Sequence, residues 1–257
     1  MQWLHELPVV WIAIIVFATF ALLVAGIYLI TMRLAVGERA TALTLVSPGL
    51  LPPIGIVLAL IVGFLAAGVW GDVEKARDAE SSEASALRAV VLLSDQLPAG
   101  DAARMRVLIR RHIERAVHSE WPAMARQDAS LSAIPVPLVQ ALDLALTVKP
   151  QTDGQSVAQR EIVTALQKAL DARRQRIIVS DSRINAVKWL GLLGLSVVML
   201  FAIAFVHSGN RTTVAIAMSL FAAAVAVVVV MLVSQDQPFT GQLGLDPDLL
   251  EQVLPPQ

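Results

Sequence analysis

Four segments of the chain contain no charged residue, and polar stretches separate them. They run from Val9 to Met32, from about Leu50 to Gly71, from Trp189 to Val206 and from Thr212 to Val233. A transmembrane helix needs about 17 to 25 mostly apolar residues, so each segment is long enough to cross a bilayer. Because lipid offers no hydrogen-bond partner, the backbone of such a segment must satisfy itself internally. The pattern therefore predicts four transmembrane helices.

A long charged stretch, residues 72–188, separates the second span from the third. It holds most of the chain's twenty basic and twenty-one acidic residues, and its apolar positions recur every three or four residues. That spacing is typical of amphipathic helices and predicts a helical extramembrane domain. No proline interrupts the junctions around Gly71 and Trp189. We therefore expect spans two and three to continue into this domain as unbroken helices.

The predicted fold is an all-α integral membrane protein. Residues 1–71 form a first transmembrane helix pair and residues 72–188 the charged helical domain. Residues 189–233 form the second transmembrane pair, and residues 234–257 an acidic tail that contains proline and glycine. The composition agrees with this fold, because only 16% of the chain is charged and its mean hydropathy is +0.67, whereas a soluble domain carries about a quarter charged residues. The net charge of −1 predicts no nucleic-acid partner.

Basic residues in the loops give an expected orientation in a bacterial inner membrane. Arg33, Arg39 and Arg211 lie in the short loops on one side, while the two tails on the other side carry no lysine or arginine. By the positive-inside rule those loops are cytoplasmic, and the helical domain is extracytoplasmic. Four basic residues at the junctions of the domain itself favour the opposite orientation. We take the extracytoplasmic side as the expectation.

The sequence contains none of the common catalytic or cofactor-binding motifs. It has no GxSxG, HExxH, Walker A or GxGxxG motif, and no cysteine that could act as a nucleophile or thiolate ligand. His112 and His118 are six residues apart and cannot share a helix face, so we interpret them as solvated surface residues rather than metal ligands. We expect no enzymatic activity, no catalytic residue, no cofactor and no bound metal.

Two kinds of charged run each allow two interpretations. The acidic run that follows span two consists of Asp72, Glu74, Asp78, Glu80 and Glu83. It is a cation-attracting collar with Asp72 and Glu74 at a pore mouth, or a divalent-ion site, or else a solvated helix face balanced by nearby lysine and arginine. The arginine runs are Arg110-Arg111 and Arg173-Arg174-Gln175-Arg176. They steer anions or bind lipid head groups, or they too are solvated surface. In both cases the pattern favours the solvated surface.

The four spans contain no Asp, Glu, Lys, Arg or His. Proton-coupled carriers and voltage sensors depend on such groups inside the membrane, so their absence disfavours those classes. A channel needs none, since a pore can be gated by an apolar constriction. Span two is the best candidate to line a pore, with Ile56, Leu60 and Phe64 on one face. The neighbouring small residues Ala59, Gly63 and Ala67 permit close helix contact, and the stripe is equally consistent with packing alone.

Several strings in the sequence resemble the bacterial bestrophin-like domain family. They are Gly63-Phe64-Leu65-Ala66 leading to Trp70, Glu83-Ala84-Ser85-Ala86-Leu87-Arg88, Leu97-Pro98, Glu120-Trp121-Pro122, Arg173-Arg174-Gln175-Arg176-Ile177, and Ser234-Gln235-Asp236-Gln237-Pro238-Phe239-Thr240-Gly241. The resemblance extends from span two to the C-terminus. It implies kinship with bestrophins, pentameric anion channels in which two helix pairs flank a helical domain. By that resemblance, Glu83, Arg88, Glu120, Trp121, Pro122, Asp236, Pro238 and Phe239 are structural family motifs.

Two of these motifs give specific structural expectations. Trp121 is expected to lie buried between helices of the soluble domain, and Pro122 to end its helix. Pro238 cannot continue span four, so the chain should turn there. Phe239 should then dock on the helical domain or on a neighbouring subunit.

The leading functional hypothesis is a homo-oligomeric passive ion channel, anion-selective by resemblance, with span two lining the pore. Its partners would be the lipid bilayer, inorganic ions and further copies of the chain, five in all by analogy with bestrophins. The alternative is a non-conducting membrane scaffold or sensor whose helical domain binds a partner protein or ligand.

Overall fold

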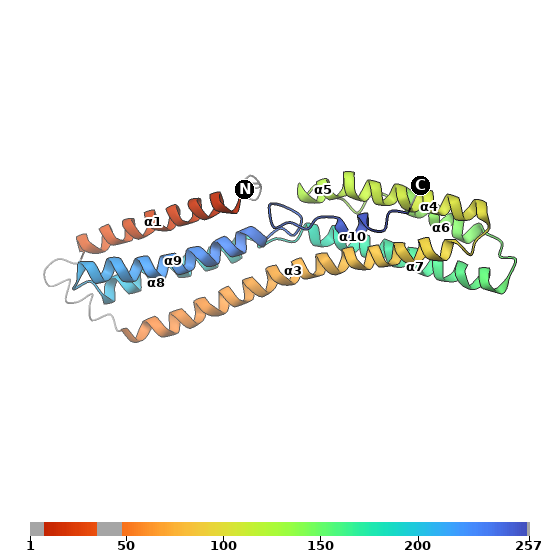
Figure 1. Ribbon diagram of the computed structural model, residues 1–257. Coiled ribbons are helices and arrows are strands. Elements are labelled where there is room, and N and C mark those ends of the chain that lie inside the picture. The colour runs from red at the N-terminus through yellow and green to blue at the C-terminus, as the bar shows by residue number, and fades with distance from the viewer. Residues whose placement is uncertain (1–7, 35–47, 256–257) are drawn as a thin grey trace. The chain divides into compact units, whose positions relative to one another are not determined.

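The computed structural model describes residues 8–34 and 48–255, and all regular elements in these ranges are helical (Figure 1). The long helices are α1 (Val9–Leu34), α3 (Leu51–Ser94), α7 (Asp153–Ser180), α8 (Ala186–Val206) and α9 (Arg211–Gln235). Shorter ones are η2 (Pro48–Leu50), α4 (Ala99–Arg115), η3 (Ala116–Glu120), α5 (Trp121–Ala125), α6 (Val136–Thr147) and α10 (Asp248–Glu251). The chain divides into two compact units. A membrane unit comprises residues 1–70 and 183–236, and a helical unit comprises residues 71–182 and 237–257.

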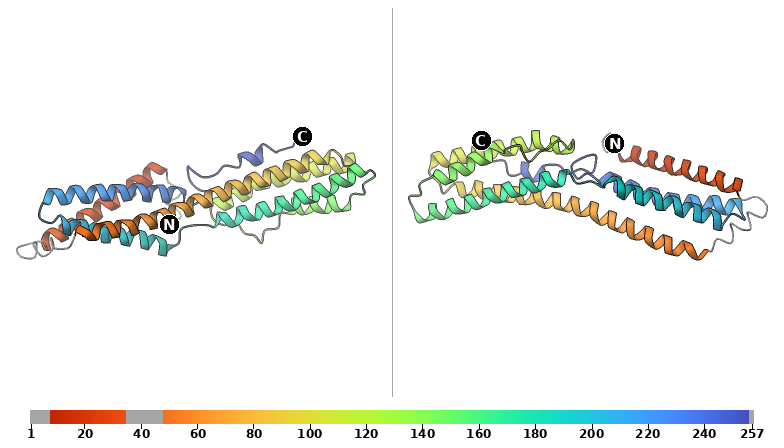
Figure 2. Two further views of the ribbon diagram at one scale, coloured as in Figure 1. Left: turned by 90° about the horizontal axis from the view of Figure 1, so that it is seen from below. Right: turned by 180° about the vertical axis from the view of Figure 1, so that it is seen from behind.

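The membrane unit contains the four helices that are long and apolar enough to cross a bilayer. α1, α8 and α9 pack on one another (Figures 1 and 2). Their shared core includes Phe20 of α1, Leu200 of α8 and Met218 of α9, and the first half of α3 adds Leu58 and Leu65. These spans and the all-helical architecture confirm the predicted fold class. Arg39, which entered the orientation argument, lies outside the described residues.

α3 is a single helix of 44 residues, so span two continues into the helical unit as predicted. Span three does not, and the expectation of an unbroken helix there was wrong. α7 ends at Ser180 and α8 begins at Ala186. The side chain of Asn185 accepts a hydrogen bond from the Lys188 backbone N–H, which starts α8 with an N-cap. Asp236 Oδ1 accepts the Ile184 N–H at 2.7 Å in the same turn.

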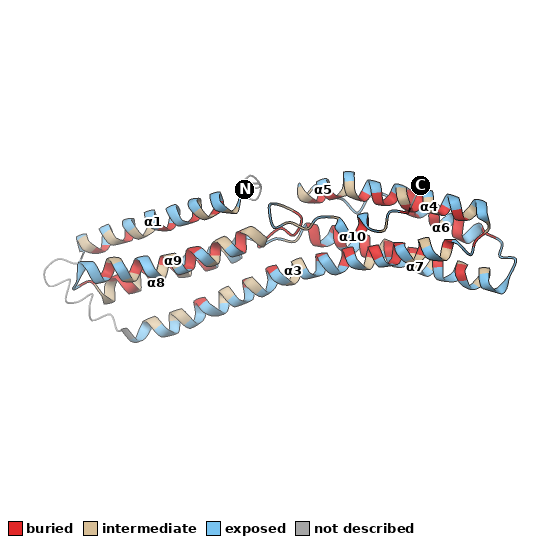
Figure 3. Ribbon diagram, viewed as in Figure 1, coloured by how far each residue is buried: buried red, intermediate tan, exposed pale blue. Residues whose placement is uncertain are grey.

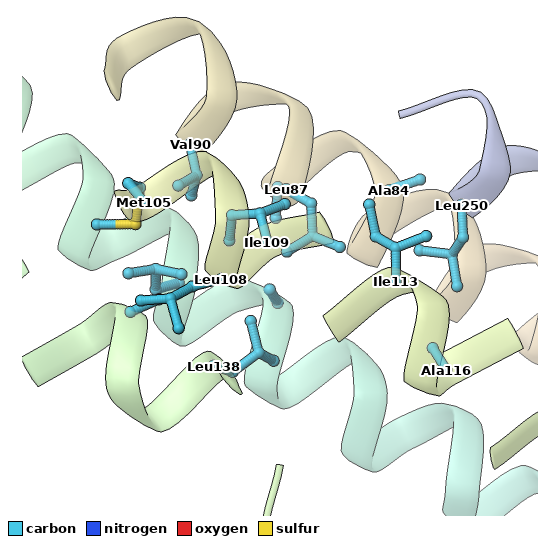
Figure 4. Packing of buried hydrophobic residues seen from close by; sticks show 14 of the residues in the cluster. Ala84, Leu87, Val90, Met105, Leu108, Ile109, Ile113, Ala116, Leu138 and Leu250 are labelled. Carbon is cyan, nitrogen blue, oxygen red and sulfur yellow. The ribbon is translucent and has the colours of Figure 1, made fainter. Parts of the chain in front are cut away.

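The helical unit is built from the second half of α3 together with α4, η3, α5, α6, α7 and the C-terminal segment. Each long helix carries a stripe of buried residues on one face and exposed residues on the other (Figure 3). Figure 4 shows how these stripes meet: Leu87 of α3 and Ile109 of α4 point toward each other, near Leu138 of α6. This arrangement follows the 3.6-residue period seen in the sequence.

Pro122 does not end its helix, contrary to the prediction. The chain remains helical from α4 through η3 to α5, because η3 is a π-helical turn in which the Trp121 N–H reaches back five residues to the Ala116 carbonyl. Pro122 then lies in the first turn of α5, directly after the π turn. Glu120 is the last residue of this π turn, and Trp121 follows it directly.

The C-terminal segment turns after α9 and docks on its own helical unit, as expected for Phe239. The Phe239 ring is buried and meets the Trp121 ring edge to face, with centroids 5.3 Å apart. Its loop is tight: Gly241 has a φ of 81°, and a Cβ on Gly244 would come within 3.1 Å of backbone atoms of Phe239 and Thr240. Only glycine fits both positions without strain.

Candidate functional site

The helical unit encloses a buried ion cluster, defined here as Glu83, His112, Glu120, Arg173 and Arg176. Its members come from α3, α4, η3 and α7, so it joins four helical elements. Glu83, His112 and Arg176 have no exposed side-chain surface. Charged side chains are almost never fully buried unless they are paired, and in this cluster each charge has its partners.

Glu83 and Arg176 form the centre of the cluster. Arg176 Nε donates to Glu83 Oε2 at 2.9 Å, and Arg176 Nη2 donates to Glu83 Oε1 at 3.3 Å. The pair is thus bidentate, the geometry in which a planar guanidinium holds a carboxylate most firmly. Arg176 Nη2 also donates to Glu120 Oε2 at 3.2 Å, so one guanidinium bridges two carboxylates.

The electrostatics of this pair keep both groups charged. Burial alone would raise the pKa of Glu83, but the adjacent Arg176 guanidinium and the hydrogen bond from His112 lower that pKa to about 2. Burial would likewise lower the pKa of Arg176, and the carboxylates of Glu83 and Glu120 raise it instead. Glu83 is therefore a carboxylate at neutral pH and acts only as a hydrogen-bond acceptor.

His112 completes the coordination of Glu83. Its Nε2 lies 2.8 Å from Glu83 Oε1. Because the carboxylate accepts, Nε2 must carry the hydrogen and donate it. Its Nδ1 is buried and has no hydrogen-bond partner in the described part of the chain. The interpretation of His112 as a solvated surface residue was wrong. It lies on the same buried face of α4 as Ile109 and Ile113, and that apolar spacing was the available signal.

Glu120 extends the cluster toward the surface. Arg173 Nε donates to both of its carboxylate oxygens, at 2.9 and 3.1 Å, and Arg173 Nη2 donates to the Ala133 carbonyl at 3.1 Å. The neighbouring Trp121 ring stacks under Arg176, whose guanidinium carbon lies 4.8 Å from the ring centroid. Trp121 Nε1 donates to the Leu245 carbonyl at 2.7 Å. Through Trp121 the cluster therefore contacts the C-terminal segment directly.

The interpretation of the charged runs as solvated surface was wrong for four of their residues and right for others. Glu80, Glu83, Arg173 and Arg176 are buried, whereas Asp78 and Arg174 are exposed. The arginine run at 110–111 divides as well. Arg110 donates to the Pro255 carbonyl, and Arg111 lines an open surface groove between α4 and α6 together with Glu114, Arg115, Val136, Pro137 and Gln140.

The remaining family motifs have separate positions. Arg88 is exposed on α3 and lies outside the ion cluster. Pro238 is buried, and its carbonyl accepts the Leu245 N–H at 2.8 Å, which closes the loop around Phe239. Asp72 pairs with Lys75 at 2.9 Å, and Glu74 is exposed one turn into the charged part of α3. In the ranges 8–34 and 48–255, no group of three or more acidic or histidine side chains is arranged to hold a metal ion.

The face of α3 that carries Ile56, Leu60 and Phe64 is uncovered in the single chain. These side chains are 62%, 56% and 76% exposed. At about 100° per residue they span a sector of about 80°, and the buried residues Leu58 and Leu65 lie on the opposite side of the helix. Gly63 lies next to this face, and a Cβ added there would meet no neighbouring side chain or other helix within 4 Å. The structure thus leaves a continuous apolar face on α3 that residues 8–34 and 48–255 do not cover.

Comparison with known proteins identifies the family. The sequence matches the family model of the Bestrophin-like domain over residues 8–250. No curated protein matches it. A point variant of a bacterial bestrophin homologue from Klebsiella pneumoniae has a similar crystal structure, with a TM-score of 0.67 at 12% identity over 96% of this chain and 97% of its own. The same homologue phased with zinc gives a TM-score of 0.66 at 12% identity over 96% of each chain.

A crystal structure described as a membrane protein variant has a TM-score of 0.68 at 13% identity, covering 93% of this chain and 96% of its own. At these identities the likeness establishes the fold. The family match, which covers nearly the whole chain, establishes more: this protein is a member of the Bestrophin-like domain family.

Proposed function

We propose that the protein is a passive ion channel of the bestrophin type, formed by several copies of the chain around the first half of α3. Membership in the Bestrophin-like domain family supports a channel, because bestrophins are ion channels. The observation that carries the proposal is the uncovered apolar face of α3. Ile56, Leu60 and Phe64 are exposed in the single chain although they lie in a span that must be surrounded by lipid or protein.

α3 is the least buried of the four candidate spans found in the described residues. In α3, 17% of the most apolar stretch is buried within the chain, compared with 22% in α1, 33% in α8 and 39% in α9. Lipid alone would tolerate such a helix. However, the small residues Ala59, Gly63 and Ala67 are exposed beside the bulky face, and small residues at this spacing favour close contact between helices. Copies of α3 meeting along that stripe would turn Ile56, Leu60 and Phe64 toward a shared axis.

A pore lined in this way would be gated by apolar side chains. A ring of large apolar residues resists ion passage because the narrow segment dewets. Asp72 and Glu74, two turns and more beyond Phe64, would lie at the mouth of the pore. The absence of Asp, Glu, Lys, Arg and His from the four spans argues against coupling to protons. Anion selectivity is the expectation from the bestrophin resemblance, and we include it in the proposal together with a non-enzymatic role.

Phe64→Ala is expected to raise the basal conductance of the purified, reconstituted protein, because it removes the largest side chain of the constriction. Planar-bilayer recordings of wild type and variant, with the oligomer size of each checked beforehand, measure the change. Val62→Ala is the matched control, since Val62 lies on the same helix but packs against its own chain. Equal conductance in all three proteins, or a Phe64→Ala protein that only loses packing and assembly, would contradict a pore role for this face.

The second candidate is a non-conducting scaffold or sensor. It is favoured by exposed apolar residues on the outward face of α6 and the loop before it, namely Ile134, Val136, Val139 and Leu146. An apolar patch of this kind suits a partner protein. Well-assembled protein that passes no current under varied ions and voltages would favour this alternative.

A further inference from the structure

The C-terminal segment is attached to α3 through a buried carboxyl group. Glu80 lies in the charged half of α3, is 3% exposed, and its Oε1 accepts the Leu249 N–H at 3.1 Å. The contact joins residues 169 positions apart in the chain. It holds α10, the short helix Asp248–Glu251, against the extramembrane half of the helix that carries the candidate pore face.

Apolar contacts accompany this hydrogen bond. Leu250 is fully buried. Figure 4 shows its side chain beside Ala84 of α3 and Ile113 of α4, where it completes the core of the helical unit. The segment docks mainly by burying this leucine, and Glu80 has to be buried with it. An ionisable group therefore lies under the docked segment.

Two charged side chains from other elements face Glu80. Arg176 of α7 favours its ionised form, and Asp248 of α10 opposes it. Burial is the largest influence: it raises the pKa of Glu80 above its usual value, although the N–H groups of Leu249 and Leu250 act in the opposite direction. Arg176 already donates hydrogen bonds to Glu83 and Glu120, which limits how far its charge can offset the cost of burying an ionised Glu80.

We propose that residues 247–253 form a pH-sensitive strap, which docks more firmly on α3 when the Glu80 carboxyl is protonated and loosens when it ionises. The strap is a property of the helical unit, so it does not depend on whether the protein conducts ions. If the protein is a channel, the contact between the strap and the extramembrane half of the pore helix α3 would depend on pH.

The sign of the effect follows from linkage. Detachment of the strap would expose Glu80 to water and return its pKa toward the ordinary value of 4.5. Because the pKa is higher in the docked state, the docked state binds the proton more tightly, and acid favours docking. Protonation of Glu80 stabilises the docked strap fully at a pH below the pKa that Glu80 has in the undocked state. This stabilisation is lost as the pH rises through the higher pKa that Glu80 has in the docked state.

Glu83 provides an internal contrast, because its pKa is lowered to about 2. Its contribution to stability is present above the ordinary pKa of 4.5 and is lost only as the pH falls toward 2. The ion cluster is therefore disrupted only in strong acid. Acid destabilises this cluster, whereas it stabilises the docked strap. A strap that loosens as the pH rises above the ordinary carboxyl value of 4.5 would therefore reflect Glu80 rather than Glu83.

A spin label can report strap mobility directly, because the chain has no native cysteine. Gln252→Cys places the label on an exposed strap residue, and Gln167→Cys places a control label on an exposed residue of α7. In the full-length protein in detergent, the mobile fraction of the Gln252 label should rise at least about twofold from about pH 5 to about pH 8. The Gln167 label should not change.

Glu80→Gln tests the assignment, since glutamine keeps the carbonyl acceptor for Leu249 and cannot ionise. In this background the strap label should stay immobile across the whole range. Asp248→Asn removes the opposing carboxylate, so the mobility transition should move to lower pH, and this variant decides the question if Glu80→Gln does not fold. A wild-type label that ignores pH, a Glu80→Gln protein that responds like wild type, or an unmoved transition in Asp248→Asn would each overturn the proposal.

Discussion

Arg176→Met is expected to lower the free energy of unfolding of the helical unit by about 3 to 5 kcal/mol, because it leaves the Glu83 carboxylate buried without its cation. Arg176 supplies two hydrogen bonds to Glu83 and one to Glu120, and it also stacks on Trp121. Methionine fills a similar volume, so the loss is electrostatic rather than a cavity. The Glu83 carboxylate cannot recruit water in compensation, because it has no exposed surface.

Thermal unfolding of the purified variant, followed by far-ultraviolet circular dichroism, measures this loss. Arg174→Met is the matched control, since Arg174 is exposed on the same turn of α7 and should change the melting temperature little. Adding Glu83→Gln to Arg176→Met removes the orphaned charge while keeping an acceptor for His112, so it should restore part of the stability. Equal melting temperatures for Arg176→Met and Arg174→Met would show that the cluster does not stabilise the unit.

Trp121→Ala is expected to cost about 3 to 5 kcal/mol, the range for truncating a buried aromatic side chain. The indole is 6% exposed, packs edge to face on Phe239 and donates to the Leu245 carbonyl. Its loss opens a cavity between α5 and the C-terminal segment and removes the stacking partner of Arg176. The segment around Phe239 should become accessible to protease at a lower temperature than in wild type.

Trp121→Phe separates packing from hydrogen bonding. It retains an aromatic ring and removes the Nε1 donor, so it should cost about 1 to 2 kcal/mol by leaving the Leu245 carbonyl unpaired. Ion selectivity should not change in either variant, because the expected role of Trp121 is structural. A well-folded Trp121→Ala protein with altered selectivity would overturn that assignment.

The sequence was sufficient to predict the features that depend on local pattern. Charge-free runs located the four spans, and the 3.6-residue period identified the buried faces of the helical unit, including Met105, Leu108 and Ile113 of α4. The burial of Trp121 and the docking of Phe239 were also predicted, and both rings are buried in the helical unit.

The ion cluster could not be predicted because its partners are distant in the sequence. Glu83 is 29 residues from His112 and 93 residues from Arg176. A charged residue is expected to be solvated until a partner is known, and no local spacing indicates that partner. The π turn at η3 was missed for a related reason. A single extra residue in a helical turn leaves no pattern in the sequence, although Glu120 and Trp121 lie at the end of this turn.

The pore face of α3 can be tested most directly by cysteine accessibility, which the cysteine-free chain permits. Leu60→Cys lies in the middle of the exposed face, and Val62→Cys on the side that packs against its own chain. Purified oligomers of each variant in planar bilayers are exposed to a charged methanethiosulfonate reagent during recording. If α3 lines the pore, the reagent reduces the current through Leu60→Cys and leaves that through Val62→Cys unchanged. An unchanged current through the Leu60→Cys protein after complete labelling would contradict the claim that α3 lines a pore. The absence of current from every well-assembled protein would contradict it as well.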